Sequence, residues 1–137
     1  MKQILLDTNI ALDLLARRMP FYNDAALLFS QADKKKISLS ISALSLANIH
    51  YIISKLKPEK ETRKILRNLK ILVLVLSLDD KIVDLALNSD FHDFEDAIQY
   101  FTAIQNSQEL IITRNMSGYR KSRIPIMTAR EFIESSL

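Results

Sequence analysis

Acidic side chains are crowded into one short stretch of this chain, DFHDFEDA at residues 90–97. Its acids are Asp90, Asp93, Glu95 and Asp96. Carboxylates this close repel one another unless a helix N-terminus, basic side chains or a bound cation offsets the repulsion. A further acid, Asp7, directly follows a short apolar run at residues 3–6. Grouped carboxylates suit Mg²⁺ or Mn²⁺, and carboxylate-bound Mg²⁺ is a common apparatus for hydrolysing phosphodiesters because it orients and acidifies water.

A simpler interpretation of the same acids needs no metal. Asp is a good helix N-cap, and acids in a first helical turn are favoured by the helix dipole. Asp93 as a cap with Asp96 three residues later satisfies both preferences, and Asp7 alone is equally consistent with a strand-to-helix cap. The joint occurrence of both groups in a chain without other catalytic apparatus favours the metal site.

The elements that would position these acids alternate between strands and helices. Short apolar or alternating runs predict strands, and apolar residues three to four apart predict helices. The expected strands are 3–6, 37–41, 71–76, 110–112 and 124–127, the last at an edge because of Pro125, and the expected helices are 10–16, 22–32, 43–55, 59–69, 80–87, 97–105 and 129–135. Ser42 and Thr128 are expected helix caps, Thr128 with Glu131 in a capping box. This alternation predicts one α/β domain over residues 1–137, a three-layer α/β/α arrangement with a parallel sheet.

Composition excludes several other chemistries. The chain has no cysteine, so disulfides and thiol nucleophiles are absent, which fits a cytoplasmic location. Gly118 is the single glycine, so phosphate-binding glycine loops and a serine nucleophile elbow are excluded. The amino-terminal residues do not look like a signal peptide, and no apolar run is long enough to span a membrane. The net charge of +3 mildly favours a polyanionic partner.

The order of four motifs resembles the PIN-domain family, and within it the small bacterial proteins of the VapC-like type. The motifs are LLDTNIALDLL, SALSLANIHYII, DFEDAIQY and ITRN, spread over almost the whole sequence. The resemblance implies a parallel sheet of strand order 3-2-1-4-5 and an endoribonuclease that depends on Mg²⁺ or Mn²⁺. It also implies RNA as the substrate, a partner antitoxin protein and a homodimer.

Carried over by position, the resemblance assigns catalytic and metal-binding roles to Asp7 and Asp96. The neighbouring acids Asp93 and Glu95 are additional candidates for catalysis, and Asp93 also for the metal. Polar residues that would orient ligands or water are Asn9, Asn48, Thr113 and Asn115. Two positions depart from the family pattern, because Asn48 stands where a Glu is often found and Gly118 where an Asp is often found. Both replacements reduce the negative charge available to cations.

Basic residues after the fourth expected strand are candidates for nucleic-acid binding. They are Arg114, Arg120, Lys121 and Arg123, with Tyr119 as a ring that could stack on an unpaired base. A second basic stretch, residues 55–70, is better explained as the solvated face of a helix.

Three hypotheses follow. The first is a metal-dependent, toxin-type ribonuclease. The second is a catalytically weakened module of the same fold that binds RNA or protein. The third is a phosphatase with Asp7 as its nucleophile, which is less favoured because no second Asp stands two residues after Asp7.

Overall fold

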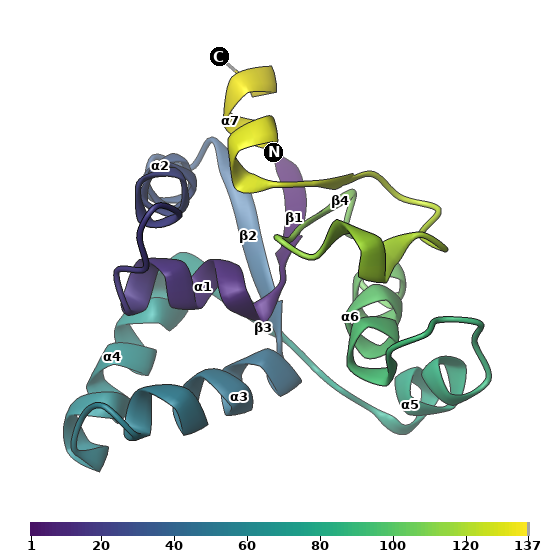
Figure 1. Cartoon of the computed structure of the whole chain (residues 1–137), viewed down its shortest axis with the longest axis horizontal. Helices are drawn as coiled ribbons and strands as arrows, with labels where there is room; N and C mark the ends of the chain where they lie inside the picture. The colour runs from purple at the N-terminus through teal and green to yellow at the C-terminus, as the bar shows by residue number, and fades with distance from the viewer. Residues whose placement is uncertain (137) are drawn as a thin grey trace.

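A five-stranded parallel sheet forms the middle layer of the protein (Figure 1). The structure is a computed structural model and describes residues 1–136. The strand order is β3-β2-β1-β4-β5, which confirms the α/β/α fold expected from the sequence. The strands are β1 (Lys2–Leu6), β2 (Ile37–Ser42), β3 (Val73–Leu76), β4 (Leu110–Ile112) and β5 (Ile126–Met127).

Helices cover both faces of this sheet. They are α1 (Thr8–Leu15), α2 (Tyr22–Asp33), α3 (Ala43–Ser54), α4 (Glu59–Leu72), α5 (Asp80–Leu87), α6 (Phe94–Gln105) and α7 (Ala129–Ser136), with a short 3-10 helix, η1 (Met116–Tyr119). Alternate residues of β1 serve the two faces. Ile4 and Leu6 enter a large core with residues of α1 to α4 and α7, whereas Leu5 packs with Tyr100 and Ala103 of α6.

Several predicted boundaries were wrong by a few residues. The expected strand 71–76 begins only at Val73, because α4 continues through Leu72. Leu72 packs against the large core from the helix, while Ile71 points outward with 79% of its surface exposed. The run therefore read as one apolar strand although its first two residues complete a helical stripe. The expected edge strand 124–127 is likewise reduced to Ile126–Met127, but it does lie at the edge.

The predicted helix caps are confirmed. The Ser42 hydroxyl accepts from the backbone N–H of Ser45 at 3.0 Å, and Thr128 and Glu131 exchange the two bonds of a capping box. Helix α1 begins at Thr8, two residues earlier than expected, because Asp7 caps it. Helix α6 begins at Phe94 rather than at residue 97, because Asp93 caps it.

The sheet brings the ends of its two central strands together. Leu6 of β1 lies beside Ile112 of β4 in the parallel register. Asp7 and Thr113 therefore leave neighbouring strands at the same edge of the sheet, which is where parallel α/β sheets place their ligand sites. None of the helices within residues 1–136 combines the length and apolar character that crossing a bilayer requires.

Candidate active site

Asp7 is held from three directions at the end of β1. Its Oδ1 accepts a hydrogen bond from the backbone N–H of Thr8 at 2.8 Å. Its Oδ2 accepts two more, from the Thr113 hydroxyl at 2.8 Å and from the Tyr119 hydroxyl at 3.2 Å. Thr113 is itself fixed, because its hydroxyl oxygen accepts from the backbone N–H of Asn115 at 2.9 Å. These contacts fix the orientation of the Asp7 carboxylate before any ligand binds.

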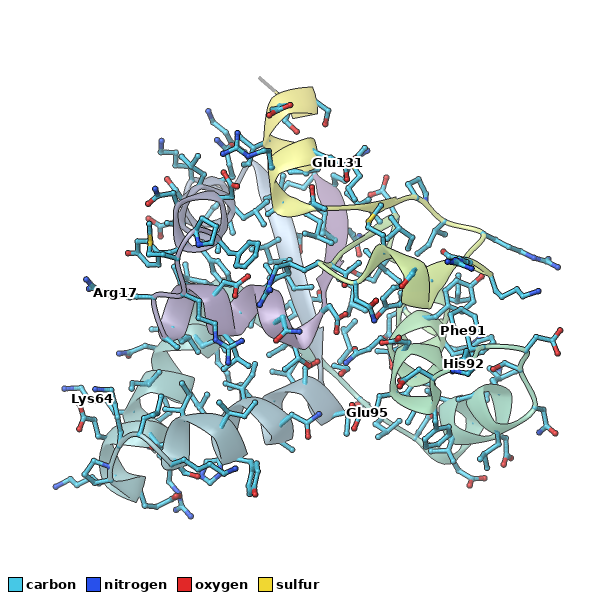
Figure 2. All side chains as sticks on the ribbon, in the orientation of Figure 1. Arg17, Lys64, Phe91, His92, Glu95 and Glu131 are labelled. Carbon is cyan, nitrogen blue, oxygen red and sulfur yellow. The ribbon has the colours of Figure 1, made fainter. Side chains whose placement is uncertain are left out.

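The acids of the DFHDFEDA stretch approach Asp7 from the N-terminus of α6. Asp93 caps the helix, and its Oδ1 accepts from the backbone N–H of Asp96 at 2.9 Å. Asp96 lies in the first turn and is only 9% exposed, and its Oδ2 accepts from the Asn115 side-chain amide at 3.3 Å. In Figure 2, Glu95 lies between helices α3 and α6. The capping role predicted for Asp93 is thus present.

Burial is the main reason why the pKa of the Asp96 carboxyl rises from 3.8 to about 6. The negative charges of Asp7, Asp93 and Glu95 raise it further, while the Tyr119 hydroxyl acts in the opposite direction. The pKa of Tyr119 is raised far above its ordinary value by burial and by the charges of Asp7 and Asp96, so its hydroxyl stays protonated and serves as a donor. The acids therefore form one electrostatically coupled group.

One open cleft of about 420 Å³ collects most of the residues assigned from the sequence. Its lining includes Asp7, Asn9, Asn48, Asp93, Glu95, Asp96 and Asn115. The remaining walls come from Thr8, Leu12, Tyr51, Ile52 and Gln99. Hollows of similar size occur elsewhere on the surface, so size does not single this cleft out. Its carboxylates do.

The donor set of the cleft fits a hard divalent cation in kind and in charge. All of the candidate ligands offer oxygen, and no Lys or Arg lines the cleft to neutralise the acids. The raised pKa of Asp96 reports the same lack of compensation. Within residues 1–136, however, no three His, Cys, Asp or Glu side chains already converge as a ligand group. Asp7 and Asp96 form the floor, and Asp93 or Glu95 would have to turn inward to complete a shell.

The two departures from the family pattern occupy different surroundings. Asn48 lines the cleft from α3, so its neutral amide does stand where a carboxylate would face the acids. Gly118 instead packs directly on Asp96. A Cβ built on Gly118 would collide with Oδ2 of Asp96 and would lie 2.8 Å from the Asn115 amide nitrogen. The position therefore has no room for an additional acid unless Asp96 moves.

The structure does not gather the five predicted nucleic-acid contacts into one surface. Tyr119 is only 2% exposed and its ring packs on Phe91, so it is not available to stack on a base, and that prediction was wrong. Arg114 is bound to the buried carboxylate of Asp13, with N–O distances of 3.0 and 3.1 Å, and covers the ring of Phe21. Its expected role on RNA is therefore replaced by a structural contact.

Three basic residues of that set remain on the surface. Arg120 is exposed on the loop, and Lys121 and Arg123 line a separate hollow beside α6.

The sequence gave no signal for a buried polar chain beneath the cleft. The Gln99 amide donates to the Ser45 hydroxyl at 2.7 Å, and that hydroxyl bonds Thr8 Oγ1 at 2.8 Å. Gln99 Oε1 is buried without a partner among the described residues. The chain links α6, α3 and α1, the three helices that wall the cleft. The spacing of polar residues on α6 could have indicated Gln99, which lies three residues after Asp96 on the same helical face.

Comparisons with known proteins agree with this arrangement. A family model described as a PIN domain matches residues 3–117. The chain is 23% identical to ribonuclease VapC1 of Aquifex aeolicus (strain VF5), over 97% of this chain and 94% of that protein. A toxin–antitoxin complex from Klebsiella pneumoniae has a chain of the same fold, with a TM-score of 0.67, 25% identity and coverage of 92% of this chain and 97% of that one. VapC20 of Mycobacterium tuberculosis, described as a sarcin-ricin loop cleaving toxin, matches with a TM-score of 0.62 and 14% identity over 79% of this chain and 86% of that one.

Proposed function

Because the chain belongs to the PIN-domain family, we propose that it is a metal-dependent endoribonuclease of the VapC-like toxin type. The observation that carries the proposal is the meeting of Asp7 and Asp96 in one cleft at the carboxyl edge of the sheet. The relative from Aquifex aeolicus bears the name ribonuclease, and its match extends over nearly the whole of both chains. The cleft also carries uncompensated negative charge, which a substrate made of phosphates tolerates only with a cation between them.

Asp7, Asp96 and Asp93 are the residues that would hold Mg²⁺ or Mn²⁺, with Glu95 beside them. Such an ion, when bound, supplies a more acidic water and neutralises charge on the phosphate oxygens. The protein contributes position. Thr113 and Tyr119 restrain the Asp7 carboxylate, and Asn115 restrains that of Asp96.

Two amides face the open part of the cleft and can orient water or phosphate oxygens. Asn48 contributes from α3 and Asn9 from α1. Asn9 Oδ1 accepts from Arg18 at 3.2 Å, so its amide NH₂ remains a free donor among the described residues. Amide groups donate to anionic oxygen without adding negative charge, which suits the wall that would face RNA.

The same proposal includes partners. RNA is the substrate, an antitoxin is the protein partner, and the active form is a homodimer in the cytoplasm. The toxin–antitoxin assembly named for the Klebsiella pneumoniae structure supports the partner, and the exposed apolar side chains Tyr51, Leu56, Ile71 and Leu74 supply surface for association.

A second candidate, an RNA- or protein-binding module with a weakened site, is favoured by one observation. Asn48 replaces a potential carboxylate in the cleft, and no three-acid ligand group is preformed within residues 1–136. The module would bind RNA equally well in EDTA and would not cut it.

Cleavage of a labelled pool of structured RNAs tests the two against each other. Wild type and Asp7→Asn are incubated with Mg²⁺, Mn²⁺ or EDTA. The nuclease predicts cutting with metal that EDTA abolishes and that Asp7→Asn lowers by at least about 100-fold, as loss of one key electrostatic group commonly does. An Asp7→Asn chain that is folded and cuts at the wild-type rate would refute the assignment of Asp7. A folded wild type that cuts nothing with either metal would leave the binding module.

A further inference from the structure

A second hollow lies beside α6, separate from the acidic cleft, with a volume of about 480 Å³. Its lining residues are Ser89, Asp90, Phe91, Tyr100, Phe101, Ile104, Lys121 and Arg123, none of which lines the cleft. Figure 2 shows Glu95 on the side of α6 that faces α3 and Phe91 on its other side. The volume lies within the range of about 300–1,000 Å³ that is usual for small-molecule sites.

Three aromatic rings form the wall of this hollow. Phe91 lies 4.9 Å from Tyr100 and 6.1 Å from Phe101 between ring centroids, and Tyr100 lies 5.0 Å from Phe101. Tyr100 is buried, whereas Phe91 and Phe101 are partly exposed and Ile104 is 36% exposed. The rings thus pack on the core with one side and offer apolar surface to the hollow with the other.

Two cations stand at the rim beside these rings. Neither Lys121 nor Arg123 takes part in an ion pair among residues 1–136. The backbone N–H of Arg123 donates to the Tyr100 hydroxyl at 3.2 Å, so the basic loop is attached to the aromatic wall. One acid, Asp90, shares the rim, and the balance of the rim remains positive. Partly exposed rings next to unpaired cations are what a single-stranded nucleotide needs, a surface for its base and charges for its phosphates.

The hollow is connected to the acidic cleft through two structural links. Phe91 packs edge-on against Tyr119 at 6.4 Å, and the Tyr119 hydroxyl holds Asp7. Along α6, Tyr100 and Ile104 follow Asp96 at intervals of four residues, about 6 and 12 Å along the helix axis. A strand with its reacting phosphate at Asp7 and Asp96 can therefore reach the hollow within a few nucleotides.

We propose that this hollow binds an unpaired nucleotide of the RNA, with the base against Phe91 and Phe101 and the flanking phosphates on Lys121 and Arg123. The inference rests on the ribonuclease function proposed above and adds a second contact point outside the cleft. It assigns substrate selection to the hollow, since a base can enter it only where the RNA is unstacked.

Binding of a short single-stranded RNA that carries 2-aminopurine at successive positions tests the proposal. The full chain is used in EDTA, so that the RNA stays intact, and fluorescence reports both affinity and stacking. The first variant is Lys121→Gln with Arg123→Gln, two exposed residues whose loss leaves the core unchanged. Its matched control is Lys34→Gln with Lys35→Gln, two exposed residues that precede β2 at the opposite end of the sheet.

The proposal predicts that the Lys121 and Arg123 pair lowers affinity by about 5-fold or more and reduces the slope of log affinity against log salt by about 1.4, or 0.7 per phosphate. Phe101→Leu keeps an apolar side chain but removes a ring, so quenching at one RNA position should disappear and affinity should fall by about 5-fold. Affinity of the Lys121 and Arg123 pair equal to that of the control pair would overturn the proposal. Unchanged quenching in a folded Phe101→Leu chain would do so as well.

Cleavage by wild type with Mg²⁺ or Mn²⁺ is measured separately. If wild type cuts no RNA but its binding depends on Lys121, Arg123 and Phe101, the nuclease function fails and the nucleotide site stands. If wild type cuts RNA and the variants bind like the control, the nucleotide site fails and the nuclease function stands.

Discussion

The hydroxyl of Tyr119 donates a hydrogen bond to Oδ2 of Asp7 over 3.2 Å, from inside the core. A side chain that follows β4 thus fixes an acid that follows β1. The contact gives Tyr119 a role in the site that differs from the base stacking expected from its position in the sequence.

Tyr119→Phe removes this donor and keeps the ring. Because hydrogen bonds to charged groups contribute more than neutral ones, we expect a loss of about 1–2 kcal/mol in the free energy of unfolding and slower RNA cleavage. Urea unfolding and cleavage with Mg²⁺ measure the two effects. Tyr22→Phe, on α2, is the control. Equal behaviour of the two variants in both assays would contradict the role of the hydroxyl.

Asp96 should make stability depend on pH. Its folded pKa of about 6 exceeds the ordinary 3.8, so between these pH values the folded chain keeps a proton that the unfolded chain has lost. The stability it contributes is complete below about pH 3.8 and is lost as the pH rises through about 6. In EDTA, Asp96→Asn should therefore be more stable than wild type at pH 7.5, and the difference should vanish near pH 4. Asp80→Asn, on α5, should show no such trend.

Asp93 and Asp79 provide a test of metal binding against capping. Each caps a helix, and each accepts a backbone N–H at 2.9 Å, but only Asp93 lines the cleft. Asn caps as well as Asp, so neither Asp93→Asn nor Asp79→Asn should lose its cap. Mn²⁺ at ten times its Kd should stabilise wild type by about 1.4 kcal/mol, and by less in Asp93→Asn only. Equal metal-induced stabilisation in both variants would leave Asp93 as a cap alone.

Gly118→Ala should harm the site rather than improve it. The added Cβ collides with the Asp96 carboxylate, which must move or push η1 away. We expect a loss of about 1–3 kcal/mol in stability, as for other overpacked sites, together with weaker cleavage. Gly118→Asp should behave similarly and should not strengthen metal binding. Ser117→Ala, at the exposed neighbouring residue, is the control for both, and a Gly118→Asp chain that binds Mn²⁺ more tightly would contradict this expectation.

Arg114→Gln should act through the fold. It leaves Asp13, 1% exposed and already raised in pKa by its burial, without its ion-pair partner. Loss of one partner of a buried pair is expected to cost about 3 kcal/mol or more. The double variant Asp13→Asn with Arg114→Gln should recover part of that stability. A stable Arg114→Gln chain with a smaller salt dependence of RNA binding would restore the nucleic-acid role predicted from the sequence.

Local patterns carried most of the fold. The runs at β1, β2 and β4 are bounded by strong caps or turns, so their places follow from the sequence within one residue. The start of β3 did not follow, because Ile71 and Leu72 satisfy a strand pattern and a helical stripe equally well. Asp7 and Asp96 were recognisable because the edge of a parallel sheet must bring such acids together.

Contacts across more than a hundred residues were not recognisable. Nothing next to Tyr119 in the sequence indicates that its ring is buried, and nothing near Arg114 points to Asp13. The packing of Gly118 on Asp96 is of the same kind, because a missing acid reads as lost charge while the reason lies in the space around it. These relationships depend on the docked position of the segment after β4, which local spacing does not encode.

The position of β1 at the centre of the sheet also sets the order in which the cleft is completed during protein synthesis. Its neighbour β4 pairs Ile4 with Leu110, so one side of the first strand stays open until nearly the whole chain has left the ribosome. Until then Asp7 lacks both Thr113 and Tyr119, and Asp96 lacks Asn115. An unfinished chain that ends before β4 therefore carries the acids but not the supports that aim them.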